Sequence, residues 1–243
     1  MSERQRADRL LVERGLFESR AKAQAAIAAG LVTADGAPVR KASDEISANA
    51  VIQAAPEHPW VSRGGVKLAA ALDHFGINPK GRICLDVGAS TGGFTQVLVA
   101  RGARRVYAVD VGRDQLHAIL RRQADIISFE DTDIRTLSPA LLPEPPDLIV
   151  ADVSFISLKL VLPTALALAR RPVHLLALIK PQFEAGRGNR KRGIVRDPPV
   201  HQAVCDDIAA FVAAFGCDIL GVIPSPLAGG DGNREFFIGA RHD

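Results

Sequence analysis

The sequence predicts an α/β protein in which an open, mostly parallel seven-stranded sheet follows a small α+β module. From residue 82 onward, short apolar runs bounded by turn or charged residues alternate with helix-length segments, which is the pattern of strands joined by crossover helices. The last two apolar runs are separated only by a glycine-rich turn. We therefore expect them to pair as antiparallel strands at the end of the sheet. A chain of 243 residues is long enough for two domains.

The first 55 residues predict the α+β module. A short amphipathic helix is expected over 6–15, and a second helix with a serine cap is expected over 19–30. Asp35 and Gly36 lie between β-prone flanks, which is the strongest short-range signal for a tight hairpin. Residues 45–53 supply another strand-compatible run.

A linker is expected over 56–63, where two prolines remove backbone donors from any regular element. The sheet domain then takes up residues 64–243. Its helices are expected at about 66–75, 93–101, 114–123, 157–171 and 199–215. Its strands are expected at about 83–88, 105–111, 125–130, 147–153 and 173–180, followed by the final pair at 218–227 and 234–241.

The composition is that of an ordinary globular protein, with 47% hydrophobic residues, 23% charged residues and a formal net charge of +3. This charge is too small to indicate a nucleic-acid partner by itself. The three cysteines and six histidines lack the spacing of a disulfide framework or a zinc site, so no metal is expected. Because there is no apolar leader and no run of ~18–20 apolar residues, we expect a soluble cytoplasmic protein; its oligomeric state stays open.

The clearest chemical signature is a glycine-rich loop between a predicted strand and the helix that follows it. Gly88, Gly92 and Gly93 allow a tight turn and a close approach of the backbone to a ligand. Their spacing differs from the G-x-G-x-x-G of pyrophosphate-binding loops, and Asp86 stands two positions before the first glycine. A carboxylate there would repel a pyrophosphate and attract a cationic amino acid. The loop therefore favours S-adenosylmethionine, which carries an ammonium, a sulfonium and no phosphate.

Carboxylates also follow the next two predicted strands. Asp110 can accept hydrogen bonds from both hydroxyls of a ribose, and Asp133 is placed to meet the amino group of an adenine. Any one of these acids could be an ordinary loop residue, but three at successive strand ends favour a cofactor site. The residues expected to bind the cofactor are Asp86, Gly88, Ser90, Thr91, Gly92, Gly93, Phe94, Asp110, Asp133 and Asp152.

Four further charged residues are expected around the same edge of the sheet. Asp152 and Lys180 each close an apolar run, where packing alone would not favour a charge. Lys67 and Glu235 lie at a helix start and at the start of the last strand. Catalytic groups gather at the carboxyl ends of strands in open α/β folds. The alternative for any one of the four is a surface ion pair.

Several motifs of the second domain resemble one family. They are SRGGVKL, LDVGASTGGFTQVL, ADVSFISL, IKPQFEAGR, GIVRD and GNREFF. These strings are similar to those of the TlyA-type ribosomal RNA 2′-O-methyltransferases, relatives of the FtsJ-like enzymes. The resemblance implies a Rossmann-like class I methyltransferase fold, S-adenosylmethionine as cofactor and the ribose 2′-hydroxyl of a cytidine in ribosomal subunits as acceptor. It also implies a catalytic tetrad of Lys67, Asp152, Lys180 and Glu235.

The N-terminal segment resembles the RNA-binding module of a small-subunit ribosomal protein, the αL motif. The resemblance implies that Arg6, Arg9, Arg20 and Lys22 present positive charge to RNA. Residues 1–59 carry no net positive charge, so we expect the module to orient RNA more than to hold it. In the second domain, RNA contacts are expected at Arg63, Arg187, Arg190, Lys191 and Arg192, although the last four could belong to a solvated loop.

The expected reaction is an in-line attack of a ribose 2′-hydroxyl on the sulfonium methyl group. Lys180 would orient or deprotonate that hydroxyl, and Lys67 would stabilise the developing negative charge. Phe183 would either stack on a flipped base or pack in the core. Two other functions stay open, a pseudouridine synthase, which the glycine-rich loop disfavours, and a non-catalytic ribosome- or RNA-binding factor. Relatives called haemolysins suggest a lytic protein, but no spanning or strongly amphipathic apolar segment supports a pore.

Overall fold

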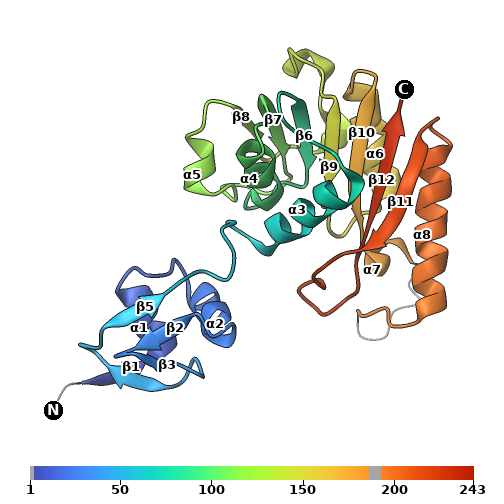
Figure 1. Cartoon of the computed structure of the whole chain (residues 1–243). Coiled ribbons are helices and arrows are strands. Elements are labelled where there is room, and N and C mark those ends of the chain that lie inside the picture. The colour runs from blue at the N-terminus through green and yellow to red at the C-terminus, as the bar shows by residue number, and fades with distance from the viewer. Residues whose placement is uncertain (1–2, 186–192) are drawn as a thin grey trace. The chain divides into compact units, whose positions relative to one another are not determined.

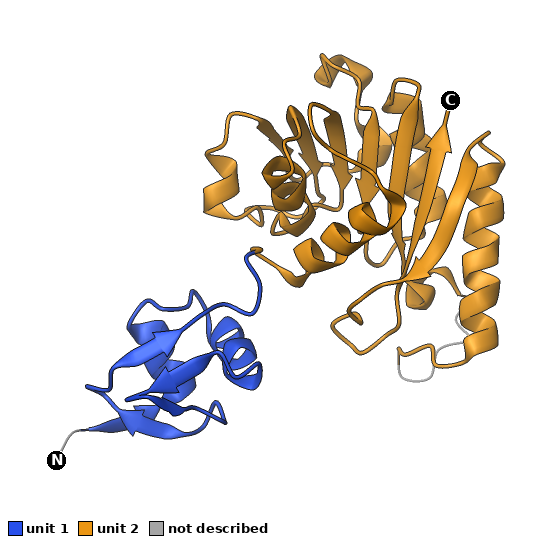
Figure 2. Cartoon of the chain, viewed as in Figure 1, with its two compact units in different colours: residues 1–59 blue, residues 60–243 orange. Residues whose placement is uncertain are grey.

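The computed structural model describes residues 3–185 and 193–243, and the chain divides into two compact units (Figure 2). Unit 1 comprises Met1–Pro59 and unit 2 comprises Trp60–Asp243. The boundary lies within the segment 56–63, for which the sequence predicts a linker. Each unit has a hydrophobic core of its own, with two clusters in unit 2, one on each face of its sheet.

Unit 1 packs two helices against short strands, as expected for an α+β module. The helices are α1 (Ala7–Glu13) and α2 (Arg20–Ala28), and the strands are β1 (Arg4–Arg6), β2 (Val32–Ala34), β3 (Ala37–Pro38), β4 (Glu45–Ser47) and β5 (Ile52–Ala54). Strand β1 pairs with β4, and β2 pairs with both β3 and β5, in each case antiparallel. The predicted cap of the second helix is confirmed, because the Ser19 hydroxyl accepts a hydrogen bond from the backbone N–H of Lys22.

The predicted hairpin is also confirmed. Asp35 and Gly36 connect β2 to β3 with φ angles of 50° and 77°, the two positive values that a tight two-residue hairpin turn requires. Two other expectations were wrong. Arg6 belongs to β1 and not to the first helix. The run 45–53 is not one strand, because the backbone N–H of Ala50 donates to the carbonyl of Ser47 and the turn sends β4 and β5 into different sheets.

Unit 2 is built on a seven-stranded sheet, as predicted (Figure 1). Its strands are β6 (Ile83–Val87), β7 (Arg105–Val109), β8 (Ile126–Phe129), β9 (Leu148–Ala151), β10 (Val173–Ile179), β11 (Asp218–Pro224) and β12 (Phe236–His242). They lie in the order β11-β12-β10-β9-β6-β7-β8. All neighbours are parallel except that β12 runs antiparallel to both β10 and β11, which confirms the expected antiparallel pair at the end of the sheet.

Helices cover both faces of this sheet (Figure 1). Helices α3 (Arg63–Phe75) and α4 (Gly93–Ala100) lie on one face, and α6 (Leu158–Leu168) and α8 (Pro198–Ala213) lie on the other. Successive side chains of a strand point to opposite faces, so Ile83 and Leu85 of β6 join the cluster under α6 and α8 while Cys84 joins the cluster under α3 and α4. Burial on both faces explains why these strands are continuous apolar runs in the sequence.

Three helices of unit 2 differ from their predicted extents, and one of them, α6, ends at Leu168 and not near residue 171. Helix α3 begins at the first residue after Ser62 and takes two glycines into its first turn. A side chain at Gly65 would place its Cβ 2.4 Å from the ring of Trp60, so tight packing requires this glycine. The helix expected over 114–123 shrinks to α5 (Ala118–Arg121). Asp114 has a φ of 52°, which a helix does not allow.

Three short elements of unit 2 were not predicted. They are the 3₁₀ helices η1 (Ile134–Thr136) and η2 (Pro139–Leu141) and the helix α7 (Pro181–Glu184). Each is a single turn, too short to show an apolar period in the sequence. Helix α7 matters for the site, because it begins directly after the end of β10.

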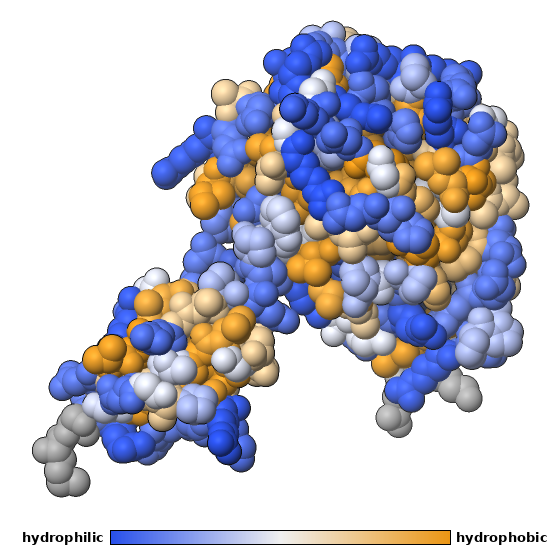
Figure 3. Space-filling view, viewed as in Figure 1, coloured by the Kyte–Doolittle hydropathy of each residue, from blue (hydrophilic) through white to orange (hydrophobic). Residues whose placement is uncertain are grey.

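Within residues 3–185 and 193–243, no helix has the length and apolar character needed to cross a membrane. The face drawn in Figure 3 carries polar side chains over both units, interspersed with apolar ones. Phe155 stands out among the described apolar residues, because 91% of its surface is exposed. It lies in the loop after β9, beside the site described next.

Candidate active site

The strand order reverses beside β6. From β6 the chain adds β7 and β8 on one side and then returns to add β9 and β10 on the other side. Ligands of open α/β sheets bind at the carboxyl ends of the strands at such a reversal. The loop after β6 is the glycine-rich loop, and the loop after β9 begins with Asp152. The fold therefore brings the two most informative sequence motifs to one crevice.

The first glycine of the loop allows this close approach. Gly88 has a φ of 83°, and a Cβ added to it would lie 2.5 Å from the carbonyl oxygen of Asp152. The backbone N–H groups of Gly88 and Ala89 both donate to the carbonyl of Val109 at the end of β7. The loop is thus packed against the neighbouring strand ends and presents backbone to the crevice.

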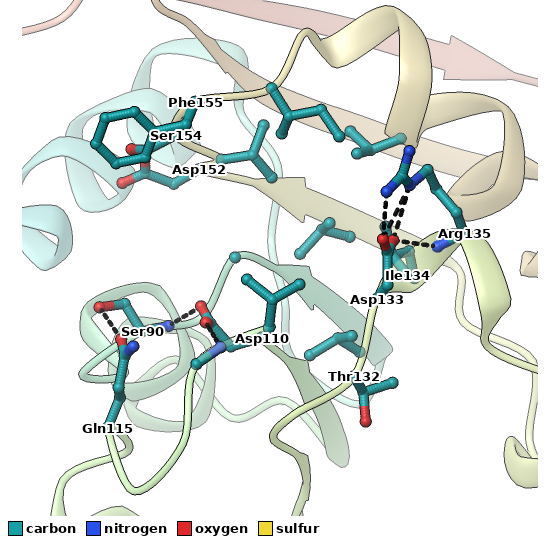
Figure 4. A pocket seen from close by; sticks show the side chains of 18 residues that line it. Ser90, Asp110, Gln115, Thr132, Asp133, Ile134, Arg135, Asp152, Ser154 and Phe155 are labelled. Carbon is teal, nitrogen blue, oxygen red and sulfur yellow. Dashed lines mark hydrogen bonds and ion pairs between the residues drawn. The ribbon is translucent and has the colours of Figure 1, made fainter.

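A cavity of about 520 Å³ opens beside this loop (Figure 4). This first cavity is lined by residues from the ends of β6, β7 and β9 and from the segment before η1. Asp110 lies at its edge, and its carboxylate accepts hydrogen bonds from the backbone N–H groups of Ser90 and Gly112 at 2.8 and 2.7 Å. Ser90 is held from the other side by the side chain of Gln115. Asp110 therefore fixes the shape of the loop as well as facing the cavity.

Asp133 lines the same cavity and caps η1. Its carboxylate accepts hydrogen bonds from the side chain and the backbone N–H of Arg135, and the Arg135 guanidinium lowers the pKa of Asp133 (Figure 4). The acid is therefore ionised at neutral pH. Since Asp133 is paired with Arg135 in this way, Asp110 contributes most of the unpaired negative charge at the cavity wall.

Two predicted cofactor residues line neither of the cavities described here. The Asp86 side chain is completely buried beneath the loop, where it accepts a hydrogen bond of 2.6 Å from the Thr95 hydroxyl while its Oδ1 has no partner. Burial raises the pKa of Asp86 to about 7. The expectation that this carboxylate meets a ligand directly does not match this position. Gly92 is a packing glycine, since a Cβ there would lie 2.3 Å from the Leu120 side chain.

Three of the four tetrad residues, Lys67, Asp152 and Lys180, line a second cavity of about 290 Å³. This cavity shares Gly88, Ser90, Asp152 and Ser154 with the first. Lys180 Nζ lies 2.6 Å from Asp152 Oδ1, and Lys67 Nζ lies 2.5 Å from Glu235 Oε2. The predicted residues Thr91, Gly93 and Phe94 also line this cavity. The structure therefore gathers the four residues into two ion pairs next to the glycine-rich loop.

Both ion pairs are withdrawn from solvent. The side chains of Lys67 and Glu235 are 8% and 3% exposed, and those of Lys180 and Asp152 are 11% and 21% exposed. Removing such charges from water costs several kcal/mol per ion, and the attraction between partners does not always recover this cost. The surface ion pair considered as the alternative is thus wrong for these residues. Buried charges in a cleft are typical of a functional site.

Ser154 is a residue of the site that sequence reasoning missed. Its hydroxyl accepts a hydrogen bond of 2.8 Å from Lys180 Nζ, and it lines both cavities. A polar residue two positions after Asp152, at the end of a buried strand, was the available signal. The next residue, Phe155, has a φ of 67° and packs against Phe183 with ring centroids 5.1 Å apart. Phe183 is therefore only half-buried beside the site and not part of the core.

The predicted RNA-binding cations have different surroundings. In unit 1, Arg6 and Arg20 both donate to the completely buried Asp8, and Lys22 pairs with Glu18, whereas Arg9 is exposed and has no partner among the described residues. In unit 2, Arg63 lines the second cavity. The remaining four predicted cations, Arg187, Arg190, Lys191 and Arg192, lie outside the described residues.

No group of three or more His, Cys, Asp or Glu side chains suited to a metal ion occurs in the described part of the chain. The three cysteines are all buried as free thiols. Burial raises the pKa of the Cys205 thiol to about 11.

Comparison with known proteins agrees with this geometry. The FtsJ-like methyltransferase family matches residues 60–242, and the S4 domain matches residues 5–52. The chain is 43% identical over 244 residues to the 16S/23S rRNA (cytidine-2′-O)-methyltransferase TlyA of Mycobacterium tuberculosis, covering 99% of this chain and 91% of the relative. It is 38% identical over 233 residues to Hemolysin A of Brachyspira hyodysenteriae, covering 95% and 97%.

Solved structures show the same fold. A hemolysin-like protein from Streptococcus thermophilus matches with a TM-score of 0.78 and 38% identity over 100% of this chain and 90% of that chain. Magnesium protoporphyrin IX methyltransferase from Synechocystis, solved with bound SAH, matches with a TM-score of 0.51 and 16% identity over 74% and 83%, a likeness of fold alone. With two paired lysines at the crevice and similarity over its whole length, the chain belongs to the FtsJ-like methyltransferases and, among them, to the TlyA-type proteins that carry an S4 domain.

Proposed function

We propose that this methyltransferase transfers a methyl group from S-adenosylmethionine to the ribose 2′-hydroxyl of a cytidine in ribosomal RNA. The observation that carries the proposal is the junction of two cavities at the end of β9. One is walled by glycine backbone and carboxylates, and the other holds Lys180 against Asp152. The relative from Mycobacterium tuberculosis has this activity in its name, and its similarity covers nearly all of the chain.

The first cavity fits S-adenosylmethionine in size and charge. Small-molecule sites commonly enclose roughly 300–1,000 Å³, and this one encloses about 520 Å³. Gly88 and Ser90 would receive the amino-acid portion, and Asp110 and Asp133 the ribose and adenine. Carboxylates suit a cation without phosphate. When bound, S-adenosylmethionine supplies an electrophilic methyl group on a cationic sulfur.

The second cavity supplies the groups that manage the proton of the ribose hydroxyl. Lys180 Nζ lies at its wall and can hold the 2′-hydroxyl by a hydrogen bond and take up its proton. Asp152 stabilises the positive charge that Lys180 then carries. Lys67, held by Glu235, places a further positive charge at the same cavity, where it stabilises negative charge developing on the 2′-oxygen.

RNA recognition is assigned to both units. The S4 domain of unit 1 presents the exposed Arg9 together with Arg6 and Arg20, whose guanidinium groups keep about half of their surface exposed while they bind Asp8. Arg63 would hold a phosphate near the second cavity. Phe155 and Phe183 offer aromatic surface beside Lys180 for a base turned out of its stack. Intact ribosomal subunits are the expected substrate.

The test combines cofactor binding with methylation of purified 30S and 50S subunits. Wild-type protein should bind S-adenosylmethionine in calorimetry and place methyl groups on ribosomal RNA. Lys180→Ala should lose at least ~10³-fold in methylation rate, as for the loss of a general base or positioning group, while cofactor affinity stays within about threefold. Lys159→Ala, which removes a lysine from a surface pair with Asp207, is the matched control and should stay active.

Two results would overturn the proposal. An active Lys180→Ala protein would remove the assigned role of that lysine. A wild-type protein that binds ribosomal subunits but neither binds S-adenosylmethionine nor methylates RNA would instead be a ribosome-binding factor that retains the fold. Mapping the methyl group by mass spectrometry on RNA from cells with and without the protein then identifies the nucleotide.

A further inference from the structure

Lys180 has two partners in the second cavity. Its Nζ lies 2.6 Å from Asp152 Oδ1 and donates a hydrogen bond of 2.8 Å to Ser154 Oγ. All three residues line the cavity, and Ser154 also lines the first cavity (Figure 4). Among the described residues, Lys67 has only Glu235 as a hydrogen-bond partner. The two lysines of the site are therefore held differently.

The hydroxyl of Ser154 has no partner other than Lys180 among the described residues. It does not cap a helix, because the cap of α6 is Ser157. The backbone at Phe155 has a φ of 67°, which is unfavourable for a bulky residue, and such strain persists only when the surroundings maintain it. This turn leaves the Phe155 ring exposed and keeps Ser154 at Lys180. We therefore assign the conformation of this loop to the site and not to the capping of α6.

Two fixed partners determine where a lysine amine can accept a proton. A neutral amine has two N–H bonds and one lone pair in a tetrahedral arrangement. Asp152 alone would leave the group free to rotate about its Cε–Nζ bond, because lysine is a flexible stem with rotatable donors. The ion pair with Asp152 holds Nζ in place, and the N–H that Ser154 accepts fixes the rotation of the amine, so the direction of the lone pair is determined. Lys67 needs no such second partner if it acts only through its charge.

We propose that Ser154 is a positioning residue that orients the Lys180 lone pair toward the ribose 2′-hydroxyl; this inference rests on the proposed function. In the step that Ser154 assists, the O–H bond of the 2′-hydroxyl breaks and a new N–H bond forms on Lys180 Nζ. The electron pair of the O–H bond stays on the 2′-oxygen, which uses it to attack the methyl carbon. The resulting ammonium keeps its ion pair with Asp152 and its hydrogen bond to Ser154, and it later releases its proton to water.

The test separates the methylation rate from substrate binding. In Ser154→Ala, the single-turnover rate at saturating ribosomal subunits and saturating S-adenosylmethionine should fall about 10- to 100-fold, the size expected for one hydrogen bond to a charged group. The KM values for both substrates should stay within about threefold. Ser154→Thr keeps a hydroxyl at the same position and should recover most of the rate.

A matched control removes a hydroxyl outside the site. Ser138 caps η2 and lines neither cavity, so Ser138→Ala should keep the wild-type rate. Because Ser154 is exposed, its replacement should leave the melting temperature within about 2 °C of wild type, which differential scanning calorimetry checks.

Three outcomes overturn the inference about Ser154. None of them contradicts the proposed function, which Lys180→Ala tests separately. A Ser154→Ala rate within twofold of wild type, alongside an inactive Lys180→Ala, means that Lys180 acts without Ser154. A loss confined to KM makes Ser154 a substrate-binding residue. A Ser154→Thr rate as low as that of Ser154→Ala shows that the loop shape matters and not the hydroxyl. If Lys180→Ala is itself active, the proposed function fails first.

Discussion

Two buried carboxylates, one in each unit, are held in opposite ways. The side chains of Asp8 in unit 1 and Asp86 in unit 2 are both completely buried. Asp8 accepts hydrogen bonds from Arg6, Arg20 and Gln24, and these partners lower its pKa strongly, the Arg6 guanidinium most of all. Among the described residues Asp86 is held only by Thr95, whose hydroxyl donates to it, and burial raises the pKa of Asp86 to about 7.

Asp8 therefore stabilises the folded state, whereas the buried charge of Asp86 destabilises it. Asp8 ties β1 and both helices of unit 1 together through fully satisfied hydrogen bonds, so its charge is stabilising. Asp86 keeps an oxygen without a partner beneath the cofactor loop, close enough to Asp152 and Asp110 that their charges raise its pKa further. Unsatisfied buried groups cost free energy and collect near functional sites. Four predictions test whether the two units differ in this way.

The largest effect is expected from two glycines with similar backbone conformations. In unit 2, Gly88→Ala forces a Cβ against the backbone of Asp152, so it should destabilise that unit by roughly 2–4 kcal/mol and weaken S-adenosylmethionine binding at least ~100-fold. In unit 1, Gly36 also has a positive φ but nothing within 4 Å of an added Cβ, so Gly36→Ala should cost only about 1 kcal/mol. Calorimetric titration measures the affinity for S-adenosylmethionine, and chemical denaturation measures the free energy of unfolding. An equal loss of stability in the two variants would show that crowding at the cofactor loop is unimportant.

The next effect is stabilising. Asp86→Asn keeps an acceptor for the Thr95 hydroxyl and removes the buried charge, so it should raise the stability of unit 2 at pH 8 by roughly 2–4 kcal/mol. In the wild type, the pKa of Asp86 is about 7 in the folded state and near 4 in the unfolded state. Between these two pH values the folded state therefore binds a proton that the unfolded state has lost. Stability from this group therefore falls as the pH rises through that window and is level above it. A wild-type and a variant curve that stay parallel from pH 5 to 8 would contradict this account.

The corresponding change in unit 1 should be destabilising. Asp8→Asn leaves two guanidinium groups without their carboxylate, and because both are about half exposed we expect a modest loss of about 2 kcal/mol. Hydrogen–deuterium exchange in the full chain should show faster exchange in α1 and α2 only. Since the pKa is lowered, the contribution is present above about pH 4 and disappears as the pH falls further. Glu18→Gln, which breaks a surface pair with Lys22, is the control and should change stability by less than about 0.5 kcal/mol.

The smallest effect concerns RNA affinity. Arg9→Ala removes an exposed cation with no intramolecular partner, so the slope of log affinity against log salt should decrease by about 1. Lys22→Ala removes a cation already paired with Glu18 and should change the slope less. Filter binding of ribosomal RNA fragments at several salt concentrations measures both slopes. Identical slopes for the two variants would mean that the ion pair opens when RNA binds.

Local patterns were sufficient to predict the strands of the large sheet, the hairpin of unit 1 and several charged residues of the site. The apolar runs of β6, β9 and β10 mark strands because burial on both faces leaves no room for polar residues. Asp35 and Gly36 mark a hairpin because few residues adopt positive φ at two successive positions. The glycine-rich loop, Asp152 and Lys180 stand out for the same reason, since glycines and charges at strand ends contradict ordinary packing. In each case the signal lies within a few neighbouring residues.

Only the tertiary structure decided which of these groups meet. Lys67 pairs with Glu235, 168 positions away, because α3 and β12 come together in the folded unit. The burial of Asp86 and the contact of Ser154 with Lys180 likewise depend on which strand ends are neighbours. Spacing along the chain does not encode these distances, because a side chain's partners and exposure are set by the packing of elements far apart in the sequence.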